Sequence, residues 1–425
     1  MTSILSEDEF TKKRRDFMSR QNDYDYEEPF IKGIHSFRIC KNKEFTYKVI
    51  EFHNEFNLPL TKRFKKEFRN INAIYFWNNF NQPVDKLPNH IKVLSFYGDF
   101  DQSLDNLPKN LIHLELGDEY GFNRSLDNLP KGLKYLFMTS SHFDKKIDNL
   151  PESLEILSLG YSFDKPIDNL PKKLAILKFS ESSNFNQRVD NLPESLIKIE
   201  FGESFNQPID FLPRNLKNLK LGDDFNQPLD FLPESLEKIS IGCGFNHSLV
   251  NLPRNCKKVK FKFDFNNEIE FSPFVEEIYF NTKFNKPLNL KNGLKKLFLD
   301  NNFNQQINNL PNSLEVLSLG YDFNQPIDNL PNNLKLISFG EKFNHPIDNL
   351  PDSIEIILFG FRYNKMRKIF DNFGNDCKFN REILKLPKNL KKLCINKNYE
   401  HLNLLKKYEN IDIEFNRKIF IYYNL

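Results

Sequence analysis

A unit of about twenty residues recurs along most of the chain, and it constrains the fold more than any other feature. Residues 205–224 read FNQPIDFLPRNLKNLKLGDD, and residues 323–342 read FNQPIDNLPNNLKLISFGEK. A weaker copy is expected to begin at Tyr363 and a last one at Phe379. So short a period predicts a solenoid, in which each coil packs only against its neighbours. The clear copies begin at Phe80, Phe100, Phe122, Phe143, Phe163, Phe185, Phe205, Phe225, Phe245, Phe265, Phe284, Phe303, Phe323 and Phe343.

Each coil is predicted to contain one short β-strand and no helix. Twenty residues with proline at one or two positions leave no room for a strand, a useful helix and two turns. The segment L-x-x-L-x-F, as in residues 334–339, ends in the period-2 alternation of a half-buried strand. Alanine, which fills close contacts between helices, occurs only at Ala73 and Ala175. The sequence therefore predicts a mainly β solenoid with a parallel sheet.

The recurring letters of the unit have structural roles in such a coil. Equivalent phenylalanines are expected to stack inside the solenoid, where burying each one contributes roughly 2–3 kcal/mol. The aspartate before L-P is expected to form a turn, and the proline fixes an extended backbone. The asparagine after each phenylalanine is expected to bind the backbone of a neighbouring coil through its side chain. These asparagines include Asn81, Asn123, Asn206, Asn226, Asn324 and Asn344.

The motif F-N-x-P-I-x-x-L-P, as in residues 205–213, is identified as the signature of the FNIP-repeat family of social amoebae and amoeba-infecting giant viruses. This family resembles the leucine-rich repeats. L-P-x-S-L-x-x-L, as in residues 150–157, is also similar to the repeats of bacterial effector proteins. The resemblance implies a curved, horseshoe-like scaffold for protein contacts. Since some members carry an N-terminal F-box, it also implies an alternative: a substrate-recognition adaptor of a ubiquitin ligase, with a divergent F-box-like segment in residues 1–79.

The chain is predicted to consist of a solenoid over residues 80–395 between two α/β caps. The N-terminal cap, residues 1–79, is expected to contain short helices at 6–18, 45–56 and 61–68 and a first strand at 73–77. The C-terminal cap, residues 396–425, is expected to contain a helix at 399–407 and a strand at 411–415. Such caps cover the apolar ends of a repeat stack.

No motif predicts catalysis or a cofactor. A nucleophile with a base, a phosphate-binding glycine loop and a metal-ligand cluster each need particular residues at particular spacings, and none is found. The five cysteines lack a C-x-x-C pair and are interpreted as reduced thiols. A column of aspartates suggests either a calcium site or turn capping, and turn capping is favoured because later coils lose the carboxylate. The column comprises Asp85, Asp105, Asp127, Asp148, Asp168, Asp190, Asp210 and Asp230.

The strand residues on either side of the middle leucine are predicted to face solvent and to bind a partner. In the central coils they form a basic row, and in the late coils an apolar strip. We expect a protein partner with an acidic centre and apolar anchors. The alternative is that lysine is simply common, and that Glu315, Lys335 and Glu355 alternate to relieve repulsion between coils. The predicted contact residues are Lys178, Lys198, Lys220, Lys238, Lys258, Lys260, Val316, Leu336, Ile356 and Leu358.

Charge and hydropathy limit the partner and the compartment. Sixty basic against 57 acidic residues give a net charge of +3, which implies no polyanion partner by itself. Nucleic acid is the less favoured ligand of the basic row, which lacks interleaved aromatic residues and is poor in arginine. No 18-residue apolar stretch or signal peptide is found. We therefore expect a monomer without a membrane partner in the cytoplasm, which is the host's if the protein is viral.

Overall fold

The structure is a computed structural model that describes residues 34–41, 46–52, 55–60, 64, 68–77, 79–117, 121–138, 142–262, 264–281, 283–364, 369–372 and 377–415. The chain divides into two compact units, and each is described by itself. The first comprises residues up to 145 together with 149–154, and the second comprises residues 146–148 and 155 onward.

The first unit is a sheet with one antiparallel and several parallel strand pairs. β1 runs antiparallel to β2, and β2, β3, β4, β5 and β6 then pair in parallel in chain order. The strands are β1 (Ile34–Lys41), β2 (Thr46–Phe52), β3 (Ala73–Phe76), β4 (Val93–Tyr97), β5 (His113–Gly117) and β6 (Tyr135–Met138).

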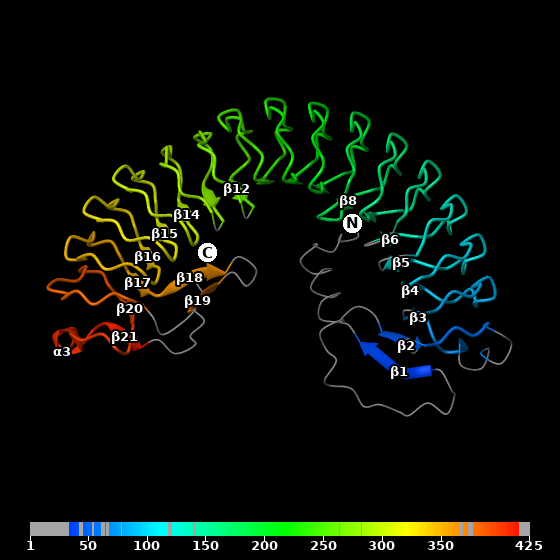
Figure 1. Ribbon diagram of the computed structural model, residues 1–425, viewed down its shortest axis with the longest axis horizontal. Helices are drawn as coiled ribbons and strands as arrows, with labels where there is room; N and C mark the ends of the chain where they lie inside the picture. Colours follow the sequence, from blue (N-terminus) through cyan, green and yellow to red (C-terminus); the bar gives the residue numbers. More distant parts are fainter. Residues whose placement is uncertain are drawn as a thin grey trace. The chain divides into compact units, whose positions relative to one another are not determined.

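The second unit continues the one-strand-per-coil pattern and adds a hairpin. Strands β7 to β17 pair in parallel in chain order, β20 pairs with β17 and β21 with β20. β18 and β19 form a separate antiparallel hairpin on the strand side of this unit (Figure 1). The elements are β7 (Ile156–Leu159), β8 (Ile176–Phe179), β9 (Lys198–Glu200), β10 (Asn218–Lys220), β11 (Lys238–Ile241), β12 (Lys258–Phe261), β13 (Glu277–Tyr279), β14 (Lys296–Phe298), β15 (Val316–Ser318), β16 (Leu336–Phe339), β17 (Ile356–Phe359), β18 (Phe361–Asn364), β19 (Ile369–Asn372), β20 (Lys392–Ile395), α3 (Leu402–Leu405) and β21 (Asp412–Phe415).

The predicted phenylalanine stack is the core of both units. The rings of Phe205 and Phe225 lie 6.1 Å apart with an interplanar angle of 8°, and both side chains are fully buried. A second ring at the strand end, such as Phe201, packs on the stack at 3.8 Å from Phe205. In the first unit the stack begins at Phe56, which lies 5.9 Å from Phe80, and in the second unit it ends at Tyr399, which lies 5.8 Å from Phe379. Stacked coils therefore extend beyond residues 80 and 395 on both sides.

The asparagine after each phenylalanine links successive coils, as predicted. Its side-chain oxygen accepts a hydrogen bond from the backbone N–H of the equivalent residue in the next coil. Asn206 Oδ1, for example, accepts from the N–H of Asn226 at 2.9 Å, and Asn81, Asn123, Asn226, Asn324 and Asn344 do the same at 2.9–3.2 Å. Successive coils are thus joined by asparagine side chains in the loops as well as by the backbone hydrogen bonds between their strands.

Glycine at the end of the strand segment is required by the close approach of neighbouring backbones. A Cβ atom at Gly222 would lie 1.7 Å from the carbonyl oxygen of Gly202. Gly360 has another role: it ends β17 with a φ of 77°, a left-handed conformation that only glycine adopts readily. The chain then reverses into the hairpin.

The structure confirms the mainly β solenoid and corrects several local predictions. The helix predicted at 45–56 is wrong, because Thr46–Phe52 forms β2 between β1 and β3. The copy predicted to begin at Tyr363 is also wrong: Tyr363 belongs to β18, and Phe343 stacks directly on Phe379 at 6.2 Å. The strand predicted at 73–77, the helix at 399–407 and the strand at 411–415 correspond to β3, α3 and β21. Residues 6–18 and most of 61–68 lie outside the described residues.

Candidate functional site

The strand face of the second unit is made by two files of side chains, one on each side of the buried middle residue. In each file, the register of the parallel strands places residues of adjacent strands directly opposite one another. The first file contains Ile176, Lys198, Asn218, Lys238, Lys258, Glu277, Lys296, Val316, Leu336, Ile356 and Lys392. The second contains Lys178, Glu200, Lys220, Ser240, Lys260, Tyr279, Phe298, Ser318, Ser338, Leu358 and Cys394.

The predicted lysines lie together on β8 to β12 and are half-buried. We call Lys178, Lys198, Lys220, Lys238, Lys258 and Lys260 the lysine row. At its start, the Glu200 carboxylate forms ion pairs with Lys198 Nζ at 2.8 Å and with Lys178 Nζ at 4.0 Å. Burial alone would raise the pKa of Glu200, but Lys198 and Lys178 outweigh it and hold the pKa below its ordinary value. This carboxylate is therefore ionised and partly neutralises the row.

A loop carboxylate also reaches the row from the side. Lys220 Nζ lies 3.2 Å from Glu181 Oε1, and Lys262, just beyond β12, lies 3.5 Å from the same oxygen. Lys262 also pairs with Asp223 at 3.4 Å. Lys220 is the main reason that the pKa of Glu181 lies below its usual range. Part of the predicted basic surface is thus paired within the chain.

The end of the row is the most densely charged part of the face. Lys258 Nζ donates to Glu277 and, at 3.0 Å, to the hydroxyl of Tyr279, whose ring also lies 5.1 Å from Lys260 Nζ. Lys238 lies directly opposite Lys258 in the register. Burial lowers the pKa of Lys258, and repulsion from Lys238 and Lys296 acts in the same direction. An anion bound here would relieve that repulsion.

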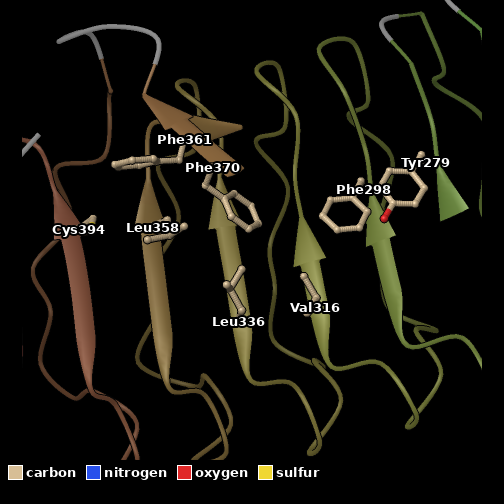
Figure 2. Close-up of a cluster of buried hydrophobic side chains, with 8 residues drawn as sticks. All are labelled: Tyr279, Phe298, Val316, Leu336, Leu358, Phe361, Phe370 and Cys394. Carbon is tan, nitrogen blue, oxygen red and sulfur yellow. The ribbon is translucent and has the colours of Figure 1, made fainter. Parts of the chain in front are cut away.

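The predicted apolar strip is not exposed, and this prediction is wrong. Val316 and Leu336 have exposed fractions of 2% and 0%, Leu358 is fully buried and Ile356 is partly buried. Hairpin β18–β19 covers them, and Figure 2 shows Phe361 and Phe370 of the hairpin in one cluster with strand residues. The buried cluster comprises Tyr279, Phe298, Val316, Leu336, Leu358, Phe361, Phe370 and Cys394.

The hairpin is joined to the strand face by polar and aromatic contacts. The Ser338 hydroxyl, buried beneath the hairpin, donates to the carbonyl oxygen of Phe361 at 2.9 Å. The ring of Tyr363 lies 4.2 Å from Phe298, which stacks on Tyr279 at 4.5 Å. Tyr279 thus links the covered region to the charged end of the lysine row. Hairpin β18–β19, a segment of the same chain, therefore occupies the apolar half of the face.

Sequence reasoning missed the hairpin and the acidic partners of the lysines. A signal for the hairpin was present: 36 residues separate the stacked Phe343 and Phe379, against about twenty elsewhere, so one coil contains an insertion. Nothing comparable marked Glu181. It lies in a loop, and 39 residues separate it from Lys220, the lysine that it contacts.

The aspartate column is used by the neighbouring coils. Asp127, for example, accepts hydrogen bonds from Ser125 in its own turn and, at 2.9 Å, from Asn149 Nδ2 in the next coil. These two bonds are the main reasons that the pKa of Asp127 is lowered. Across the described residues, no group of three or more histidine, cysteine or acidic side chains is arranged to hold a metal ion.

Cys256, Cys377 and Cys394 are poor nucleophiles. Burial raises the pKa of Cys256 and of Cys394 to about 12 and that of Cys377 to about 11, so these thiols are neutral at neutral pH. All three are free and buried. The described residues also include no helix long and apolar enough to cross a membrane.

Comparison with known structures finds several similar chains. The CroV588 protein, described as a circular LRR protein, is 29% identical with a TM-score of 0.40 over 85% of this chain and 74% of its own. YopM from Yersinia enterocolitica is 18% identical with a TM-score of 0.38, over 77% of this chain and 83% of its own. InlJ from Listeria monocytogenes is 10% identical with a TM-score of 0.41, over 72% and 70%. No curated protein matches the sequence.

The FNIP Repeat family model matches the chain seven times. The matches span residues 80–119, 100–141, 143–182, 185–213, 205–244, 284–322 and 323–362, which together cover more than half of the sequence. They begin at the phenylalanines whose rings form the stacked core. The chain belongs to the FNIP repeat family.

Proposed function

We propose that the protein is a non-enzymatic interaction scaffold that binds an acidic segment of a partner protein on the lysine row of the second unit. The fold is an LRR-like repeat solenoid, a class typical of such scaffolds. The observation that carries the proposal is the register-matched pair Lys238 and Lys258, whose repulsion helps to lower the pKa of Lys258. Like charges directly opposite one another destabilise a sheet. Glu277 offsets part of this repulsion by pairing with Lys258, and an acidic segment along the row would offset more of it.

The proposed ligand is an extended acidic segment without large apolar anchors. Adjacent parallel strands are about 4.8 Å apart, and carboxylates two residues apart in an extended peptide are about 6.6 Å apart. The flexible lysine side chains would have to bridge this difference of about 2 Å per step. The apolar strip that was predicted to supply anchor pockets is covered by hairpin β18–β19. Charge complementarity therefore determines which segment binds.

The test is a binding titration with a fluorescein-labelled peptide of eight glutamates and a matched peptide of eight glutamines. The triple variant Lys220→Glu, Lys238→Glu and Lys260→Glu is expected to bind the glutamate peptide at least about tenfold more weakly at low salt. A matched triple reversal of exposed loop lysines, Lys131, Lys291 and Lys397, is expected to change binding by less than about threefold. Circular dichroism would show that both variants fold.

Two results would contradict the proposal. Equal weakening by both triple variants would mean that net charge, and not the lysine row, determines binding. Tighter binding of a single-stranded oligonucleotide than of the glutamate peptide would favour a nucleic-acid ligand instead.

A further inference from the structure

A second surface, on the loops away from the lysine row, carries two exposed phenylalanines. The side chains of Phe211 and Phe231 are 67% and 70% exposed, the highest values among the large apolar residues described. They occupy equivalent positions in adjacent coils, each between the aspartate and the leucine of D-x-L-P. In the next coil Val250, 40% exposed, stands at the aspartate position beside them. Such an exposed apolar group suggests a contact surface.

In most other coils this position is an asparagine, and in several of them it binds the preceding coil. Its Nδ2 atom donates to the aspartate of that coil, as in Asn149 to Asp127 at 2.9 Å and Asn251 to Asp230 at 2.8 Å. A phenylalanine cannot make this bond. The chain has thus replaced a stabilising hydrogen bond by an exposed ring in two successive coils.

The two replacements leave the two affected aspartates in different states. Phe211 stands where an asparagine would donate to Asp190. Asp190 instead accepts a hydrogen bond from Arg188 Nε of its own coil at 2.7 Å. Asp210, which faces Phe231, has Pro208 where Arg188 stands in the preceding coil. In the part of the chain that the structure describes, the side chain of Asp210 accepts no hydrogen bond and has no cation within ion-pair distance, although Arg188 lies near enough to interact with it electrostatically.

We infer that Phe211, Asp210 and Phe231 form a binding site for an arginine side chain of a partner protein. The guanidinium group would bind the Asp210 carboxylate as Arg188 binds Asp190, and its planar faces would lie against the phenylalanine rings. Both contacts favour a cation, and the fork of N–H donors matches a carboxylate better than an ammonium group does. The site is separate from the lysine row and has the opposite charge preference.

The experiment measures binding of a fluorescein-labelled peptide, Gly-Leu-Arg-Leu-Gly, by fluorescence polarisation. Matched peptides carry lysine or citrulline in place of arginine; citrulline keeps the shape and removes the charge. The arginine peptide is expected to bind at least about tenfold more tightly than the citrulline peptide, with the lysine peptide between them.

Two variants locate the site. Phe231→Asn restores the asparagine of the repeat and gives Asp210 its missing donor, so it should fold with an unchanged or higher melting temperature and lose arginine binding. Asp210→Asn removes the charge from an exposed side chain and should weaken arginine binding by about tenfold or more. A control, Phe415→Asn, removes another exposed phenylalanine, 43% exposed, and should leave binding unchanged.

Three outcomes would overturn the inference. They are equal binding of the arginine and citrulline peptides, full binding by Phe231→Asn, and no binding of the arginine peptide at millimolar concentration. A concentration-dependent dimer that Phe231→Asn abolishes, without preference for arginine, would instead assign the rings to contact between two copies of the chain.

Discussion

The two halves of the strand face in the second unit differ in what covers them, although their backbone is the same. On β8 to β12 the files carry lysines that pair with Glu200 and Glu181. On β15 to β17 the same files carry Val316, Leu336 and Leu358, buried beneath hairpin β18–β19. The repeat thus fixes the core, while two variable positions per strand determine whether the face carries ion pairs or packs against the hairpin. Apolar residues on the strand face of a solenoid therefore do not by themselves indicate an exposed surface, because an insertion elsewhere in the chain can cover them.

The largest expected effect tests whether the core is equal beneath the two halves. Phe225→Ala, in a coil of the lysine half, and Phe323→Ala, in a coil of the covered half, should each lower the free energy of unfolding by about 3–5 kcal/mol, because both rings are fully buried in the stack. Urea denaturation measures both. A difference of more than about 2 kcal/mol between the variants would show that the two halves also differ in their core, and not only in the side chains on their strand face.

The next effect separates the two halves at matched positions of one file. Leu336→Ala should lower the free energy of unfolding by about 2–4 kcal/mol, because the side chain is fully buried beneath the hairpin. Lys238→Ala, in the same file, should change it by less than about 1 kcal/mol. If the two variants were equally stable, Leu336 would not be covered in solution.

A smaller and local effect is expected at the hairpin. Phe370→Ala removes a fully buried ring that joins β19 to the strand face. Hydrogen exchange of the amides of β18 and β19 should accelerate by about tenfold or more, while exchange in β10 and β11 should not change. Faster exchange in all strands would show that the hairpin supports the whole unit.

The smallest effect is a pH dependence confined to the lysine half. Burial would raise the pKa of Glu277, but Lys258, Tyr279 and Lys296 outweigh it, so the pKa is lowered in the folded protein. Its contribution to stability is present above the ordinary value of 4.5 and is lost as the pH falls through the lower, folded value. As the pH is lowered from 5 to below the folded pKa of Glu277, the free energy of unfolding should therefore fall more in the wild type than in Glu277→Gln. Urea unfolding at each pH measures this difference. Parallel loss in both proteins would reject this role of Glu277.

The sequence predicted what repeats and missed what interrupts the repeat. The stacking of rings such as Phe205 and Phe225 and the bonds of Asn81, Asn206 and Asn324 follow from the twenty-residue period, because each coil meets only its neighbours. The burial of Leu336 does not follow, because it depends on a segment that returns from a later part of the chain. For the same reason the ion pair of Lys220 with Glu181 could not be predicted. The ligase-adaptor hypothesis and the terminal caps stay predictions.

The direction of the asparagine ladder has a consequence for how such a chain changes in length. Each coil offers one side-chain acceptor to the coil that follows and uses one from the coil that precedes, as Asn206 does between Asn186 and Asn226. Where this ladder is regular, removing or duplicating one complete unit leaves the asparagine bond at each junction the same. The gain or loss of one unit of about twenty residues therefore brings a new set of surface side chains to an unchanged interior.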